Sequence, residues 1–200
     1  MRIASFDLGI INFACVIAEF DMDSDTDLVP IDVQHVFHID ITQYTHNHIS
    51  REACTLYHTP EPSDRLLHVL QEMEPYFNNM DLFIVERQPI MSTCSHLEEI
   101  LFQKFRDRIV KVSPNHMHRR FNMSADYEQR KLESVALATP LLEHIQLFQT
   151  SERKHDQADA LLLACSYVLD QRDKTRTQRL YKHSPNFLQN LNLDQYKFTQ

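Results

Sequence analysis

Residues 2–12, Arg-Ile-Ala-Ser-Phe-Asp-Leu-Gly-Ile-Ile-Asn, are a short and mainly apolar stretch interrupted by one acid, Asp7. The first six of these residues predict a buried strand with Asp7 at its carboxyl end. Open α/β sheets usually keep their sites at that end of their strands, so Asp7 is a candidate functional residue. Gly9 is the only glycine in the chain. It suits either a close backbone approach or a left-handed turn after Asp7.

The segments that follow predict a mixed sheet. Residues 13–20 are strand-like, and the alternation of apolar and polar residues from Ile31 to Ile39 predicts a third strand. The short connections between these strands favour an antiparallel meander. Residues 81–86 are almost continuously apolar, which is typical of a strand that a crossover buries on both faces, and residues 109–112 predict another strand.

Helices are expected between and after these strands. Apolar spacing predicts a helix that begins at Ser63 and stops or kinks at Pro75. A second is expected over residues 95–106, where Ser95 and Glu98 have capping-box spacing. Further helices are predicted over residues 124–139, 141–148 and 156–170. The expected fold class is α/β, with an antiparallel three-strand meander plus parallel strands in one sheet flanked by helices.

Length and composition favour one globular domain over residues 1–200, because the 42% hydrophobic content can bury a core. No stretch approaches the roughly 18 apolar residues of a membrane span, and the first strand leaves no room for a presequence. An intracellular protein is therefore expected. The four cysteines have no paired spacing and the twelve histidines no zinc-finger spacing, which favours reduced thiols over disulfides or zinc.

The net charge of −8 conceals a division along the chain. Residues 1–100 carry 4 basic and 17 acidic residues, a net charge of −13, whereas residues 101–200 carry 16 and 11, a net charge of +5. Basic residues concentrate between Lys104 and Lys131, which suits either a phosphate-binding face or a solvated helical surface. The candidate DNA contacts in this stretch are Arg119, Arg120, Arg130 and Lys131. A basic tail over residues 171–200 could equally contact DNA or be solvated.

Three more acids lie, like Asp7, at an end of a predicted strand or helix. Glu86 closes the fourth strand, and if the two strands are neighbours, both carboxylates project into one crevice. Asp156 and Asp159 are three residues apart, so they share one face of their helix. Taken singly, each acid also suits a turn or a helix N-terminus.

Four clustered carboxylates need counter-charge. Each pair of unit charges at about 4 Å repels by about 1 kcal/mol in water and about 4 kcal/mol at an effective dielectric of 20. Hard divalent cations with oxygen ligands supply the counter-charge, and two ions about 3.5–4 Å apart can activate water and stabilise the departing oxygen of a phosphodiester. The pattern therefore predicts Mg2+, with Mn2+ as a substitute, and a nuclease.

The three acidic segments resemble the active-site motifs of a known family. Residues 7–12 (Asp-Leu-Gly-Ile-Ile-Asn), 86–88 (Glu-Arg-Gln) and 155–160 (His-Asp-Gln-Ala-Asp-Ala) are similar, in order and spacing, to those of the RuvC-like Holliday junction resolvases, especially the poxvirus family also found in other large DNA viruses. The resemblance covers most of the chain. It implies a ribonuclease H-like fold and a homodimer that cuts two strands of a four-way DNA junction, leaving 5′-phosphate and 3′-hydroxyl ends. The implied ligands of two metal ions per site are Asp7, Glu86, Asp156 and Asp159.

The resemblance also implies a catalytic lysine before the last helix, and Lys131 matches it by order and spacing. An ordinary exposed lysine explains that residue equally well. Viral relatives often have a lysine where this chain has Ile11, so one phosphate contact is missing. Asn12 and Gln88 are candidates for hydrogen bonds to the ligands or the backbone. The cytoplasm or a viral replication site is the expected location.

Other functions stay open. A ribonuclease H-like nuclease of another DNA or RNA substrate would carry the same acids, and a non-catalytic DNA-binding protein could keep the fold. Retention of all four acids argues against the latter. An actin-like or sugar-kinase phosphotransferase also begins with Asp-x-Gly, but one glycine and 200 residues do not suit it. The apolar stripe of residues 95–106 is the candidate dimer seam, formed by Leu97, Ile100, Leu101 and Phe105.

Overall fold

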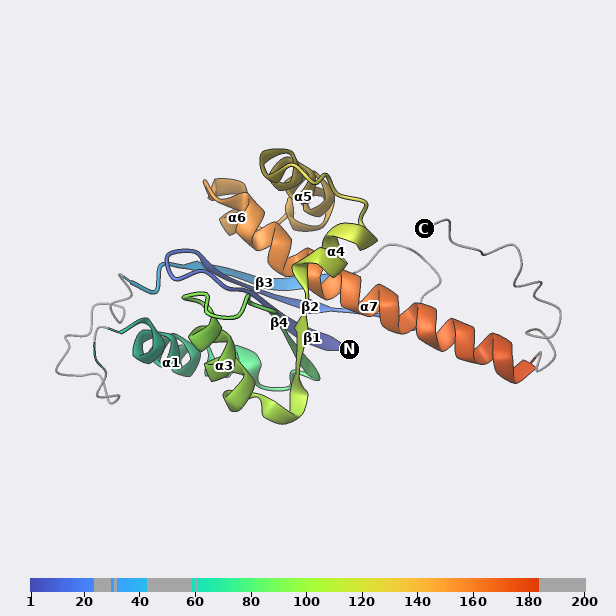
Figure 1. Cartoon of the computed structure of the whole chain (residues 1–200), viewed down its shortest axis with the longest axis horizontal. Coiled ribbons are helices and arrows are strands. Elements are labelled where there is room, and N and C mark those ends of the chain that lie inside the picture. The colour runs from blue at the N-terminus through green and yellow to red at the C-terminus, as the bar shows by residue number, and fades with distance from the viewer. Residues whose placement is uncertain (24–29, 31, 43–58, 60, 184–200) are drawn as a thin grey trace.

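The computed structural model describes residues 1–23, 30, 32–42, 59 and 61–183. Its centre is a five-stranded sheet in the order β3-β2-β1-β4-β5 (Figure 1). The first three strands pair antiparallel, and β4 pairs parallel with both β1 and β5. The predicted meander and parallel strands are therefore confirmed. The strands are β1 (Arg2–Asp7), β2 (Phe13–Glu19), β3 (Asp32–Ile39), β4 (Leu82–Glu86) and β5 (Ile109–Val112).

Helices cover both faces of this sheet. In Figure 1, α1 and α3 lie on one face, while α7 crosses the other face with α4, α5 and α6 beyond it. A short 3-10 helix, Arg106–Arg108, precedes β5. The α-helices are α1 (Pro62–Glu72), α2 (Glu74–Phe77), α3 (Ser95–Lys104), α4 (Pro114–Arg120), α5 (Tyr127–Leu142), α6 (Gln146–Thr150) and α7 (Lys154–His183).

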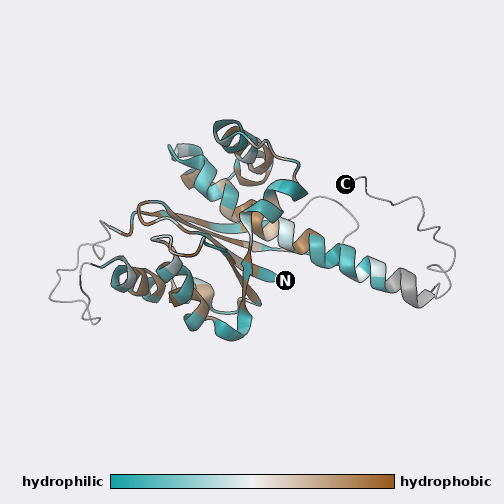
Figure 2. Cartoon of the chain, viewed as in Figure 1, coloured by the Kyte–Doolittle hydropathy of each residue, from teal (hydrophilic) through white to brown (hydrophobic). Residues whose placement is uncertain are grey.

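Each sheet face has its own apolar core because successive strand side chains point to opposite sides. Ile3 and Val16 pack beneath Leu161 of α7, whereas Phe6 and Phe83 pack beneath α1 and α3. On the second face, the rings of Phe83 and Phe105 stack with centroids 3.8 Å apart. Figure 2 shows apolar colour where α7 covers the sheet and hydrophilic colour along its projecting end. The sheet is thus buried on both faces.

Several predicted helix boundaries are wrong. α1 begins at Pro62, with Glu61 as its N-cap, rather than at Ser63. α5 continues past Pro140 to Leu142: the proline has no N–H to donate, but Glu143 N–H still donates to the carbonyl of Thr139 at 2.8 Å. No helix spans residues 141–148; the chain turns after α5 and α6 follows. At its other end α5 is capped by Asp126, which accepts a 2.8 Å hydrogen bond from Gln129 N–H.

α4 was not predicted, and α7 is longer than expected. α4 has only seven residues and one buried side chain, so its apolar pattern is too short to register. α7 was expected to end at Asp170 with its apolar residues, yet it has 30 residues and is about 45 Å long. Residues 171–183 of the predicted tail therefore continue α7. None of the described helices combines the length and apolar character needed to cross a membrane.

Parts of several expectations lie outside the described residues, namely 24–29, 31, 43–58, 60 and 184–200. The predicted start of the third strand at Ile31 and the end of the predicted tail are among them. The prediction of a single domain over the whole chain stays a prediction.

Candidate active site

Asp7 and Glu86 lie side by side at one edge of the sheet. Phe6 is paired with Val85 in the parallel ladder, so the acids that follow them occupy adjacent strand ends. Their carboxyl groups share a hydrogen bond. Burial raises the pKa of Asp7 well above its ordinary value, and the negative charge of Glu86 raises it further. Asp7 therefore binds a proton more readily than an ordinary aspartate.

The first turns of α7 bring Asp156 and Asp159 to the same place. All four acids line one cavity of about 480 Å³. Burial, reinforced by the charges of Glu86 and Asp156, raises the pKa of Asp159 to about 7, although a hydrogen bond from Ser134 opposes the rise. Asp7 and Asp159, separated by about 150 positions in the sequence, thus line the same cavity, as the sequence predicted.

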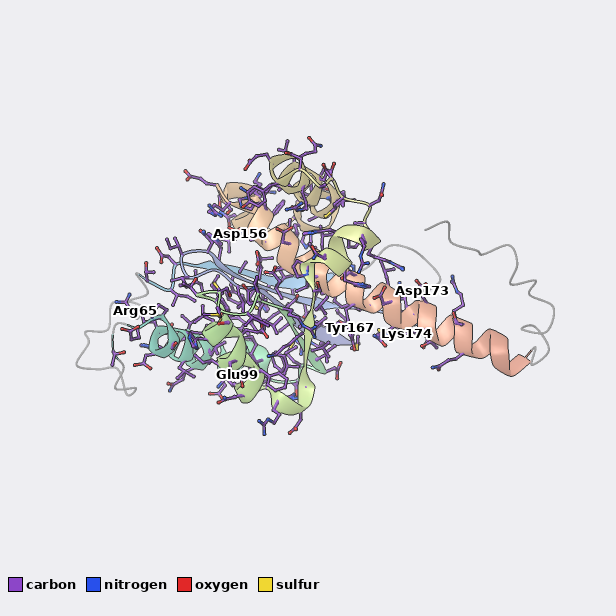
Figure 3. All side chains as sticks on the ribbon, in the orientation of Figure 1. Arg65, Glu99, Asp156, Tyr167, Asp173 and Lys174 are labelled. Atoms are coloured by element: carbon purple, nitrogen blue, oxygen red, sulfur yellow. The ribbon has the colours of Figure 1, made fainter. Side chains whose placement is uncertain are left out.

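Asp156 differs from the other acids because an arginine and two histidines lie against its carboxylate. Arg153 donates from Nε to its Oδ2 at 2.7 Å. His155 Nε2 lies 3.2 Å from Oδ1, and His38 Nε2, contributed by β3, lies 3.3 Å from Oδ2. Figure 3 shows Asp156 where α7 begins, beside the sheet. Within the described part of the chain, no three Asp, Glu, His or Cys side chains are already gathered closely enough to hold a metal ion.

Basic residues line the same cavity as the four acids. Arg130 and Lys131, both on α5, line it together with Tyr127 and His118. Lys131 Nζ lies 4.0 Å from the centroid of the Tyr127 ring and 3.4 Å from Glu128 Oε1. A hydrogen bond with Tyr127 is the main cause of a raised pKa for Lys131. The lysine therefore lines the cavity in its charged form.

The other two predicted DNA contacts lie outside this cavity. Arg119 is exposed on α4 and donates to the carbonyl of Asn115 at 3.3 Å. Arg120 is engaged with α7, because its Nη1 lies 2.6 Å from Asp173 Oδ2 and 3.6 Å from Asp170 Oδ1. Arg120 thus ties α4 to α7, and of the four basic candidates only Arg130 and Lys131 line the cavity.

Gly9 is required by close packing. A Cβ at this position would lie 2.8 Å from the carbonyl oxygen of Asn12, closer than such atoms approach. Its φ is not in the left-handed region. The close-approach explanation is confirmed, and the left-handed turn is wrong. Gly9 and Asn12 both line the cavity, so this tight loop forms its floor beside Asp7.

Glu98 does not form the predicted capping box. Its carboxylate contacts Gln88 and Lys111 instead, while Ser95 Oγ donates to the carbonyl of Ser92 at 2.7 Å. Gln88 has the predicted supporting role, because its Nε2 donates to Glu86 Oε2 at 3.1 Å.

The residues predicted to form the dimer seam are also wrong. Leu97, Leu101 and Phe105 are buried in the protein's own core, and Ile100 packs against that core. An interface between subunits cannot use side chains that already fill the space between α3 and the sheet.

Sequence reasoning missed Arg153, His38, His155 and Tyr127 as members of the site. Arg153 had a usable signal, since it precedes Asp156 by three residues, a spacing that permits an ion pair. His38 had none, because only the strand order brings β3 near the start of α7.

Known structures share this architecture. The fowlpox virus resolvase with its substrate Holliday junction DNA matches with a TM-score of 0.60 and 20% identity, covering 85% of this chain and 98% of that one. The fowlpox virus Holliday junction resolvase gives a TM-score of 0.59 and 18% identity, covering 85% and 99%. Thermus thermophilus RuvC gives 0.53 and 13%, covering 85% and 96%. The expected ribonuclease H-like fold is confirmed.

Among curated protein sequences, none matches this chain. The sequence model of the family described as poxvirus A22 protein matches residues 1–171, which confirms the viral resemblance of the three acidic motifs. Because that match spans most of the 200 residues, the protein belongs to the poxvirus A22 protein family.

Proposed function

We propose that this protein is a structure-specific endonuclease that resolves four-way DNA junctions by metal-dependent phosphodiester hydrolysis. The observation that carries the proposal is the convergence of Asp7, Glu86, Asp156 and Asp159 on one cavity that basic residues also line. Family membership and the likeness to resolvases solved with Holliday junction DNA support the substrate class.

The donor set suits a hard divalent cation. It is rich in carboxylate oxygens, which Mg2+ prefers, and Mn2+ accepts the same ligands. The pKa values of Asp7 and Asp159 are raised first by burial and then by the charges of neighbouring carboxylates, and a bound cation would offset both costs. We assign the four acids as ligands of two ions. When bound, the ions supply a more acidic water and stabilise negative charge on the phosphate.

The chain's own basic residues complete the chemistry. Lys131, kept protonated by its contacts with Tyr127 and Glu128, stabilises the extra negative charge of the phosphate during attack. Arg130 lines the same cavity and contacts a neighbouring phosphate. In-line attack by water on phosphorus then leaves 5′-phosphate and 3′-hydroxyl ends. Paired cuts across a junction require two such sites, and we assign them to a homodimer.

Cleavage of labelled substrates in Mg2+ tests the proposal. A four-way junction, a linear duplex of the same sequence and an RNA–DNA hybrid are compared, with EDTA as the metal-free control. Preferential, paired cutting of the junction is expected. Equal cleavage of all three would reject junction selectivity in favour of a general nuclease, and junction binding without any cleavage would identify a non-catalytic DNA-binding protein.

A further inference from the structure

Glu98 is a buried acid that the proposed chemistry does not use. It lies on α3, its residue is only 7% exposed, and it does not line the cavity. Both of its oxygens are nevertheless occupied. Oε2 accepts a 2.5 Å hydrogen bond from the backbone N–H of Gln88, and Oε1 lies 2.7 Å from Lys111 Nζ. Two short charge-assisted contacts hold this carboxylate in one orientation.

The contact with Gln88 leads directly to the active site. The side chain of Gln88 donates from Nε2 to Glu86 Oε2 at 3.1 Å. Gln88 therefore connects the two acids, because its backbone N–H binds Glu98 and its side chain binds Glu86. The preceding N–H, that of Arg87, donates to the carbonyl of Val112 at 2.8 Å. Two consecutive amides beyond the end of β4 are therefore fixed. The Gln88 amide group is left with little freedom relative to Glu86.

Lys111 makes the burial of Glu98 tolerable. A buried carboxylate is costly unless a counter-charge is close, and Lys111 of β5 supplies it. Its Nζ also lies 4.5 Å from the centroid of the Phe102 ring. The adjacent acid, Glu99, lies 3.6 Å from the same nitrogen, but its side chain is 52% exposed, and Figure 3 shows it on α3. Glu99 therefore offers a matched control for the charge of Glu98.

We propose that Glu98 is a positioning residue for the metal-binding carboxylate of Glu86 and acts through Gln88. The inference rests on the proposed function, because only a metal site gives the orientation of Glu86 a chemical consequence. Groups that hydrogen-bond to metal ligands set the orientation of those ligands, and their loss typically costs about 10–100-fold in metal affinity or activity. A purely structural Glu98 would only tie α3 to β5, and its loss would leave metal affinity unchanged.

Two measurements on the DNA-free protein separate a positioning role of Glu98 from a purely structural one. Calorimetric titration with Mg2+ gives the metal affinity, and melting in EDTA gives the stability of the metal-free fold. Gln88→Met removes the side-chain amide but keeps the backbone N–H that Glu98 accepts. Glu98→Gln removes the charge, and Glu99→Gln is the control. We expect the first two variants each to bind Mg2+ about tenfold more weakly, and the Gln88→Met/Glu98→Gln double variant to bind no more weakly than Gln88→Met. Glu99→Gln is expected to bind like the wild type.

A second variant covers the case in which Glu98→Gln does not fold because Lys111 is left unpaired. Glu98→Met/Lys111→Met removes both buried charges, an exchange that proteins often tolerate. Under the proposal it melts near the wild-type temperature yet binds Mg2+ about tenfold more weakly. Wild-type affinity in this variant, or independent losses that multiply in the Gln88→Met/Glu98→Gln double variant, would overturn the inference while leaving the proposed function intact. Failure of the wild type itself to bind Mg2+ would overturn both.

Discussion

Arg153 donates a hydrogen bond from Nε to Asp156 Oδ2 over 2.7 Å, where α7 begins. This bond is the main cause of a raised pKa for Arg153. The guanidinium supplies Asp156 with counter-charge, while Asp7 and Asp159 respond to their surroundings with raised pKa values. In the metal-free protein, Asp156 is thus paired with a positive side chain, whereas Asp7 and Asp159 bind protons more readily than ordinary aspartates.

Arg153→Met is expected to tighten Mg2+ binding. A cation that uses Asp156 must compete with the guanidinium, and a hydrogen bond to a charged group contributes about 1.5 kcal/mol or more, which corresponds to roughly tenfold in affinity. Calorimetry on the DNA-free protein measures the change. Arg119→Met is the control, because Arg119 lies outside the cavity. Unchanged or weaker binding would show that Arg153 and the ions do not compete.

Asp7→Asn is expected to abolish cleavage and to stabilise the metal-free protein. The amide can still hydrogen-bond to Glu86, and it removes the free-energy cost of burying Asp7 either as a charge beside other carboxylates or as an acid protonated above its ordinary pKa. The rate should fall by more than about 100-fold, the upper end for losing a merely supporting group. Melting in EDTA at pH 8 should rise by roughly 2–4 °C for each kcal/mol gained. A large fall in melting temperature would make Asp7 a structural residue.

Stability of the metal-free protein should decline as pH rises from about 4 to above 7. Asp159 has an ordinary pKa of 3.8 and a folded-state pKa of about 7, so between these values the folded state binds more protons than the unfolded chain. The penalty is absent below pH 3.8 and complete above pH 7. At about 1.36 kcal/mol for each pKa unit it amounts to about 4 kcal/mol.

Urea unfolding in EDTA at pH 5 and pH 8 measures that decline. Asp159→Asn should flatten the dependence, and saturating Mg2+ should reduce it, because the ions bind the deprotonated acids. Stability that rises over this interval in the wild type would contradict the assignment of raised pKa values to the cavity.

Lys131→Met distinguishes a catalytic lysine from an ordinary exposed one. Removal of a preorganised positive charge from the phosphate site should lower the cleavage rate by about 10²–10³-fold. Mg2+ affinity should change little, because Lys131 contacts Tyr127 and Glu128 and none of the four acids. Lys104→Met, on the exposed side of α3, is the control. Equal rates for the two variants would assign Lys131 to the solvated surface.

Gly9→Ala is expected to destabilise the protein by about 1–3 kcal/mol, the usual cost of overfilling a packed position. The new Cβ would meet the backbone oxygen of Asn12 at 2.8 Å, and backbone atoms cannot give way as a flexible side chain can. Urea unfolding gives the change. Ile11→Ala is the control, since Ile11 is 58% exposed in the same loop. A normal midpoint for Gly9→Ala would mean that the loop has room to open.

The sheet and the acidic set were predictable because both depend on local patterns. Uninterrupted apolar runs distinguish β1 and β4 from their surroundings, and each ends in an acid whose position follows directly from strand geometry. Asp156 and Asp159 follow from the periodicity of α7 in the same way. The parallel pairing of β1 with β4 places Asp7 beside Glu86, and the packing of α7 on the sheet brings Asp156 and Asp159 to the same cavity.

The supporting contacts were not predictable because they depend on tertiary distances. Glu98 has capping-box spacing, yet the approach of β5 offers it Lys111 and the end of β4 offers it Gln88, and these charge-assisted contacts outweigh a local cap. The polar second half of α7 has no apolar period, so nothing local indicates that Asp173 meets Arg120.

α7 also makes the four-acid cavity depend on completion of the polypeptide. A nascent chain that has emerged only through β4 contains Asp7 and Glu86 but neither acid of the last helix, and one apolar face of its sheet is still uncovered. The same element therefore closes the apolar core and supplies the last two carboxylates of the cavity, so a fragment that lacks α7 lacks both.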